Sequence, residues 1–220
     1  LFIPESFPFK TNTPQQIEVF LHGRMGNVNE IGFLSSRGTV SSAFGPTKPD
    51  HIVLFPFGRG NNGWRYAGEQ DVIEALADVC RRYPIDLDKV VLRGFSMGGH
   101  GVWHMSLQHP GMWAAASPGA GFVDTIQYQN MKDDFPEWQR KLLNLYDPIA
   151  YSSNASNFVM RPYVGETDTF YSQHKLITEA FLKDGTPYKQ FVGPNTGHKY
   201  EPETLKQLLT SIAGKTRDKN

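Results

Sequence analysis

The sequence has almost no cysteine, no excess of either charge and no long apolar run. Cys80 is the one cysteine among 220 residues, which excludes an intrachain disulfide. Basic and acidic side chains number 22 each, so nothing favours a polyanionic partner, and we expect no nucleic-acid role. No stretch approaches the roughly 20 apolar residues of a membrane-spanning helix. No His, Cys and carboxylate cluster has metal-ligand spacing, and no cofactor is implied.

Short apolar runs alternate with helical patterns along the chain. The runs that predict strands are 17–22, 51–56, 89–93, 113–117, 158–164 and 188–192. Helical spacing of apolar residues occurs at 72–83, 102–109, 176–181 and 205–212. Strands that are apolar on both faces indicate a parallel sheet covered by helices. We therefore expect a single α/β domain over residues 1–220, with a mostly parallel, doubly wound sheet and helices on both faces.

Residues 122–157 interrupt this alternation. The segment mixes aromatic and apolar residues with polar ones, and it is longer than an ordinary connection. We expect a short helical lid beside the functional site. A peripheral helix with no part in binding is the alternative.

The most informative motif is Gly94-Phe95-Ser96-Met97-Gly98, which follows the apolar run 90–92 and precedes a helical stretch. G-x-S-x-G between a strand and a helix forms a tight turn that exposes a serine hydroxyl above the sheet. The flanking positions tolerate only very small side chains, hence Gly94 and Gly98. This context predicts that Ser96 is a nucleophile. A glycine-rich connection with a buried serine is the alternative.

A serine hydroxyl needs a base and a carboxylate that orients the base. Asp168 and His198 each follow a predicted strand, in the chain order Ser, acid, His that accompanies such a turn. For the acid, Glu166 is the nearest rival and Asp147 a more distant one. The other histidines are better explained as packed, structural or surface residues: His22, His51, His100, His104, His109 and His174.

The negative oxygen of a tetrahedral intermediate must meet fixed donors. We expect one to be the backbone N–H of Met97, at the start of a helix. The second should come from the loop after the first strand, where Arg24 N–H is the choice and Met25 N–H the alternative. The glycine-rich loop 57–64 lacks the lysine and hydroxyl of a P-loop. We expect Trp64 in that loop, and Trp138 in the lid segment, to bind substrate.

With these residues placed, the chain resembles the α/β-hydrolase superfamily from about Ile17 to Ile212. The stretch 93–103, together with 146–148, 165–168 and 197–198, resembles a branch of esterases and predicted peptidases. That branch is similar to the catalytic domain of prolyl oligopeptidases, to polyhydroxybutyrate-depolymerase-like proteins and to feruloyl or acetyl-xylan esterases.

The resemblance implies the α/β-hydrolase fold and a serine esterase with Ser96 as nucleophile, Asp168 as orienting acid and His198 as base. It implies a small-molecule or polysaccharide ester as substrate, such as an acetyl or feruloyl ester of plant polysaccharide. A serine peptidase of prolyl-oligopeptidase type is the alternative, weakened because the chain lacks the propeller of those enzymes. The likeness to exported esterases favours a secreted or periplasmic location, and the oligomeric state is not indicated.

Overall fold

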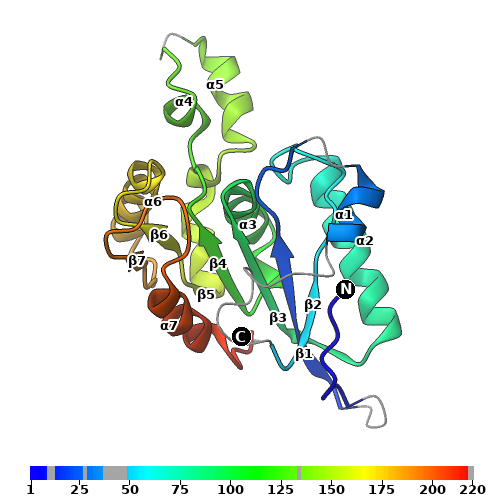
Figure 1. Ribbon diagram of the computed structural model, residues 1–220. Helices are drawn as coiled ribbons and strands as arrows, with labels where there is room; N and C mark the ends of the chain where they lie inside the picture. Colours follow the sequence, from blue (N-terminus) through cyan, green and yellow to red (C-terminus); the bar gives the residue numbers. More distant parts are fainter. Residues whose placement is uncertain (9–12, 27–28, 37–48, 133–134, 218–220) are drawn as a thin grey trace.

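The computed structural model describes residues 1–8, 13–26, 29–36, 49–132 and 135–217. Its centre is a seven-stranded parallel sheet with the order β2-β1-β3-β4-β6-β7, in which β5 also pairs with β4 (Figure 1). The strands are β1 (Gln15–Leu21), β2 (Ile52–Leu54), β3 (Ile85–Phe95), β4 (Ala115–Gly119), β5 (Val159–Met160), β6 (Tyr163–Gly165) and β7 (Phe191–Gly193). Each predicted apolar run overlaps a strand, and the expected parallel α/β sheet is confirmed.

The run 158–164 forms two strands rather than the single one expected. β5 pairs with the first half of β4, whereas β6 pairs with Gly119 at its end. Pro162 lies between them and has no N–H to donate to a neighbouring strand. Its carbonyl instead accepts from the N–H of Phe191 at 2.8 Å. The proline therefore divides the run while both halves stay in the same sheet.

Helices follow most strands at the places that the apolar spacing predicts. The α-helices are α1 (Glu30–Ser36), α2 (Ala67–Arg82), α3 (Met97–Gln108), α4 (Thr125–Tyr128), α5 (Glu137–Asn144), α6 (Tyr171–Asp184) and α7 (Pro202–Ile212). Short 3-10 segments are η2 (Pro110–Met112) and η3 (Pro148–Asn157). Within the described ranges, none of these helices has the length and apolar character to cross a bilayer.

Side chains alternate between the two faces of the sheet and so divide the core. Ile17 and Val19 of β1 pack in one cluster with residues of α2, α3 and α6. Phe20 packs on the opposite face with Phe33 of α1. On that same face, Val91 of β3 packs with residues of α7. The helices thus cover both faces, as a doubly wound sheet requires.

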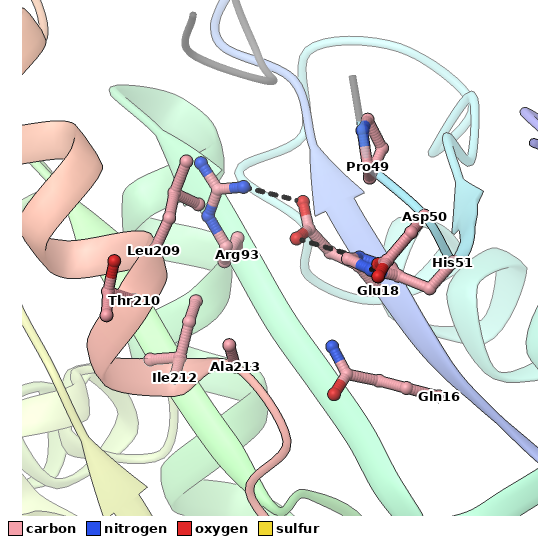
Figure 2. Close-up of a pocket in the computed structure, with 10 residues that line it drawn as sticks. All are labelled: Gln16, Glu18, Pro49, Asp50, His51, Arg93, Leu209, Thr210, Ile212 and Ala213. Carbon is pink, nitrogen blue, oxygen red and sulfur yellow. Dashed lines mark hydrogen bonds and ion pairs between the residues drawn. The ribbon is translucent and has the colours of Figure 1, made fainter. Parts of the chain in front are cut away.

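A cavity of about 360 Å³ lies between α7 and the strands β1 and β3 (Figure 2). Arg93 Nη1 donates to Glu18 Oε1 at 2.7 Å, and these side chains are only 1% and 5% exposed. His51 Nε2 lies 3.6 Å from Glu18 Oε2. Burial raises the pKa of Glu18, but Arg93 and His51 outweigh it, so this pKa lies below its ordinary value. The buried carboxylate is therefore held ionised by its cationic partner.

Part of the segment 122–157, expected to form a lid, extends away from the body of the molecule, whereas η3 at its end packs in the core through Ala155. Figure 1 shows α4 and α5 projecting from the sheet, beyond the end at which β4 leads into this segment. None of the residues 137–144 of α5 is buried. A helix of this length is marginal in isolation, so α5 adds nothing to the core that holds the sheet together.

Candidate active site

Ser96 occupies a strained turn between β3 and α3. Its backbone has φ 61° and ψ −119°, a conformation that a non-glycine residue adopts only when its surroundings impose it. A Cβ on Gly94 would lie 2.6 Å from the carbonyl oxygen of Gly98, and a Cβ on Gly98 would overlap the carbonyl of Leu21. The backbone segments approach so closely that both flanking positions must be glycine. The turn therefore has the geometry that the G-x-S-x-G motif predicts.

Asp168 and His198 meet at the carboxyl ends of β6 and β7. His198 Nδ1 lies 2.9 Å from Asp168 Oδ2, and the N–H of Phe170 donates to the other carboxylate oxygen at 2.9 Å. Burial raises the pKa of Asp168, but the bonds from His198 and Phe170 outweigh it, so this pKa lies below its ordinary value. An ionised carboxylate only accepts, so in the neutral ring Nδ1 carries the proton and Nε2 has the free lone pair.

Two ring contacts of His198 are made with the chain neighbour of Ser96 and with a residue that lines the pocket of Ser96. The His198 ring centroid lies 4.9 Å from that of Phe95, the residue before Ser96. It also lies 5.2 Å from the ring of Phe170, which lines the same pocket as Ser96. Among the described residues, no hydrogen bond joins Ser96 Oγ to this imidazole. Such contacts are often long in the absence of substrate and shorten in its complex.

The rival acids are occupied elsewhere. Glu166 Oε2 accepts from the N–H of Asn195 at 2.7 Å, which ties the loop of the acid to the loop of the histidine. Asp147 accepts from the N–H of Thr125 at 3.0 Å and lies 3.5 Å from Arg65 Nη2. Of the three carboxylates considered, Asp168 is the one that contacts His198.

The helix after Ser96 carries histidines with other partners. Arg65 Nε donates to His100 Nε2 at 3.0 Å, so His100 Nδ1 holds the proton and donates to the carbonyl of Phe122. Burial, with Arg65 adding to it, holds the pKa of His100 well below its ordinary value. His104 and His109 both bind Glu69 and lower the pKa of that carboxyl to about 2. These rings act in packing and in hydrogen bonds to Arg65, Glu69 and the carbonyl of Phe122.

The loop after β1 passes directly against Ser96. A Cβ on Gly23 would lie 3.3 Å from Ser96 Cβ. The N–H of Met25 donates to Asn61 Oδ1 at 3.0 Å, whereas the N–H of Arg24 has no partner among the described residues. Of the two donors considered in this loop, Arg24 N–H is therefore the one left available to a ligand.

A pocket of about 440 Å³ opens beside Ser96 and Met97. Three of its lining residues are aromatic, Phe122, Tyr128 and Phe170, and they belong to a wall of ring contacts that runs from His100 to His198. Successive centroids along this wall are 3.8, 4.2, 5.5 and 5.2 Å apart. The polar side chains that line the pocket are those of Arg24, Asn61, Asn62 and Arg65. Tyr128 ends α4, so the projecting segment contributes to the pocket.

The expectation that Trp64 binds substrate is wrong. Its side chain is fully buried, and its ring packs 4.6 Å from that of His22. Its indole N–H donates to the His22 carbonyl at 3.1 Å. A Cβ at position 101 would lie 2.5 Å from this ring, so Gly101 provides the space that the indole fills. Trp138 is 64% exposed on α5 and is not among the residues that line the pocket.

Several pocket residues escaped the sequence analysis. Arg65 and Asn61 follow β2, so the rule that sites form beyond the carboxyl ends of parallel strands points to their loop. Phe122 follows β4 in the same way. The stacking of Tyr128 and Phe170 joins segments far apart in the chain, and no local sequence pattern predicts this contact.

Comparison with known proteins places these features in a family. The profile of the prolyl oligopeptidase family matches residues 58–212. The fold is similar to that of a ferulic acid esterase (17% identity, TM-score 0.67, 96% of this chain and 88% of that chain). It is also similar to that of Staphylococcus aureus fluorophosphonate-binding serine hydrolase F (17% identity, TM-score 0.70, 96% and 89%).

A putative dipeptidyl aminopeptidase IV from Bacteroides ovatus is similar over part of its length (15% identity, TM-score 0.65, 90% of this chain and 31% of that chain). No curated protein matches the sequence. The fold is thus the α/β-hydrolase fold, as the resemblance implied.

Proposed function

Because the chain belongs to the prolyl oligopeptidase family and is a serine hydrolase of the α/β-hydrolase type, we propose that it cleaves carboxylic esters through an acyl-enzyme on Ser96. The observation that carries the proposal is the strained turn at Ser96, together with the imidazole that binds Asp168 and packs against Phe95 and Phe170. A hydroxyl, a base and an orienting carboxylate are the groups that this chemistry requires.

Acylation begins with attack of Ser96 Oγ on the ester carbonyl carbon. His198 Nε2 takes the hydroxyl proton as the new C–O bond forms, and the carbonyl electron pair moves onto oxygen. The N–H groups of Met97 and Arg24 bind this oxyanion. The tetrahedral intermediate collapses when the bond to the alcohol breaks and His198 returns the proton to the leaving oxygen. Asp168 holds the imidazole in the required tautomer and stabilises it while it is protonated.

Deacylation repeats these steps with water. His198 Nε2 removes a proton from the water that attacks the acyl carbon, and the same amides bind the second oxyanion. Breakage of the bond to Ser96 Oγ releases the acid, and the proton returns to the serine oxygen. The enzyme is thereby restored with no metal or cofactor in the sequence of steps.

The direct test is Ser96→Ala. Loss of the nucleophile should lower kcat for p-nitrophenyl acetate by roughly 10⁴–10⁶ while circular dichroism and Tm stay those of the wild type. A fluorophosphonate should label the wild type covalently and leave the variant unlabelled. Hydrolysis by Ser96→Ala at a rate near that of the wild type would refute the assignment.

An aryl acyl group, as in feruloyl esters of plant polysaccharide, fits the aromatic wall of the pocket. Offset-stacked rings attract one another beyond the effect of their buried area, and the similarity to a ferulic acid esterase supports this choice. We expect feruloylated sugars to be cleaved with a higher kcat/KM than acetylated xylan. The segment 122–157 would act as a small lid on a single catalytic domain, since Tyr128 and Gln129 line the pocket.

Peptide hydrolysis is the second candidate, because the matching family is that of prolyl oligopeptidases and a putative dipeptidyl aminopeptidase is similar in fold. The same triad would serve both reactions, so assays of an aryl ester and a peptide anilide on one preparation separate them. Faster turnover of the ester supports the esterase, and faster turnover of the anilide replaces it with the peptidase.

A further inference from the structure

Two loops from neighbouring strands meet beside Ser96. β1 and β2 are parallel neighbours, so the loops that follow them leave the same edge of the sheet. The loop after β1 carries Gly23, Arg24 and Met25, and the loop after β2 carries Asn61 and Asn62. Arg24, Asn61 and Asn62 all line the pocket that contains Ser96. The position of the loop after β1 therefore depends on its contacts with the loop after β2.

The second loop is internally braced. Asn62 Nδ2 donates to the carbonyl of Gly58 at 2.7 Å, and its Oδ1 accepts from the N–H of Trp64 at 2.9 Å. Trp64 is buried and donates its indole N–H to the His22 carbonyl. Asn61 is consequently presented from a loop fixed at both sides, which gives its side chain a defined place.

The carboxamide of Asn61 makes two hydrogen bonds to one residue of the first loop. Its Oδ1 accepts from the N–H of Met25 at 3.0 Å, and its Nδ2 donates to the carbonyl of Met25 at 2.6 Å. A paired donor and acceptor fix both the distance and the rotation of the backbone that they bind. The first of these bonds also engages the N–H of Met25, whereas the N–H of Arg24, a residue that lines the pocket, has no partner among the described residues.

We propose that Asn61 is a positioning residue, which sets the backbone N–H of Arg24 for the oxyanion by clamping Met25. The inference rests on the proposed serine hydrolysis. Asparagine suits the task because one side-chain group both donates and accepts. Aspartate offers no donor to the Met25 carbonyl, and alanine offers neither bond. Oxyanion donors must lie within hydrogen-bond reach of the oxygen that becomes charged, so a small shift of the loop lowers the rate.

The test compares Asn61→Ala and Asn61→Asp with the wild type and with Asn157→Ala. Asn157 is likewise an exposed asparagine with a bond to a backbone carbonyl, at 2.9 Å from Asn154, but does not line the pocket. We expect kcat for p-nitrophenyl acetate to fall roughly 10-fold to 100-fold in both Asn61 variants, less than loss of a donor outright. KM should change less than about threefold, and Tm should match that of Asn157→Ala.

A second readout separates positioning from general structure. A thionoester places sulfur, a larger and weaker acceptor, where the oxyanion forms. The wild type should prefer the oxygen ester strongly, and Asn61→Ala should reduce that preference because only the oxygen ester loses stabilisation. An unchanged preference, a wild-type kcat, or an effect on KM alone overturns the role of Asn61. If the wild type neither hydrolyses esters nor reacts with a fluorophosphonate, the proposed function fails as well.

Discussion

Asp168 combines complete burial of its side chain with a pKa below the ordinary value. Burial alone would favour the protonated form, so the bonds from His198 and from the Phe170 N–H decide the charge. His198 is more open, with 40% of its side chain exposed. The pair thus joins a shielded carboxylate to a partly exposed imidazole.

Asp168→Asn should lower kcat for an aryl ester by roughly 10³–10⁴. The amide can donate to His198 Nδ1 and so move the ring proton to Nε2, where it blocks the base. Asp184→Asn is the matched control, since Asp184 accepts from Ser152 at the end of α6 and should keep wild-type kinetics. Equal kcat values for the two variants would remove Asp168 from the mechanism.

Two tryptophans test the distinction between buried and exposed aromatic residues. Trp64→Ala should lower the free energy of unfolding by about 3–5 kcal/mol, because a fully buried indole leaves a cavity. Trp138→Ala should change it by less than about 0.5 kcal/mol, because α5 has no packed core. Urea unfolding of both variants measures the difference, and similar losses would contradict the packing described for Trp64.

At the scale of elements, the ion pair between Glu18 and Arg93 joins β1 to β3 beneath α7 (Figure 2). This pair affects stability mainly when one partner is removed, because a buried charge without its partner is strongly destabilising. The exposed pair of Lys141 and Glu137 on α5 has a similar N–O distance, 2.7 Å, but remains in water. The two pairs therefore differ in burial rather than in geometry.

Glu18→Gln should lower the free energy of unfolding by about 3–5 kcal/mol, whereas Glu137→Gln should change it by less than about 0.5 kcal/mol. The lowered pKa of Glu18 means that its contribution is present above its unfolded pKa and is lost as pH falls through the folded value. The difference in free energy of unfolding between the wild type and Glu18→Gln should therefore become smaller in acid. If this difference instead becomes larger as pH falls, the pKa of Glu18 is not lowered on folding.

Most strands and helices were predictable because the apolar patterns that indicate them lie within short stretches of sequence. Apolar runs located the strands, and helical spacing located α2, α3, α6 and α7. The helix α1 was missed because it has only seven residues, and its apolar residues Ile31, Phe33 and Leu34 do not continue into a longer helical pattern. Asn61 was missed because its bonds to Met25 span 36 positions, and pairing at that separation depends on how the two loops fold.

At the scale of the whole molecule, Arg65 connects the projecting segment to the body. It donates to His100 on α3, and its Nη2 lies within hydrogen-bond distance of Thr125 Oγ1 and the Tyr146 carbonyl. It also pairs with Asp147, whose pKa is raised because burial outweighs the bonds to the ionised form. One guanidinium thus holds both ends of the excursion that contains α4 and α5.

Arg65→Met should destabilise the fold by about 1–3 kcal/mol at neutral pH, because polar groups at both ends lose their donor. Since the pKa of Asp147 is raised on folding, the contribution of this carboxyl to stability falls as pH rises through its folded-state pKa. The loss in the variant should therefore be smaller in mild acid than at neutral pH. Arg81→Met, which breaks an exposed pair with Asp78, should change stability by less than about 0.5 kcal/mol at either pH.

The lack of buried side chains in α5 leaves the sequence 137–144 free of the demands of packing. Several residues there can be substituted together without compensating changes elsewhere. Substitutions in the sheet alter core packing and do need such changes. A library confined to these positions would keep the melting behaviour of the scaffold, because none of these side chains is buried. The helix α5 is thus the part of the molecule best suited to carry an exchanged sequence.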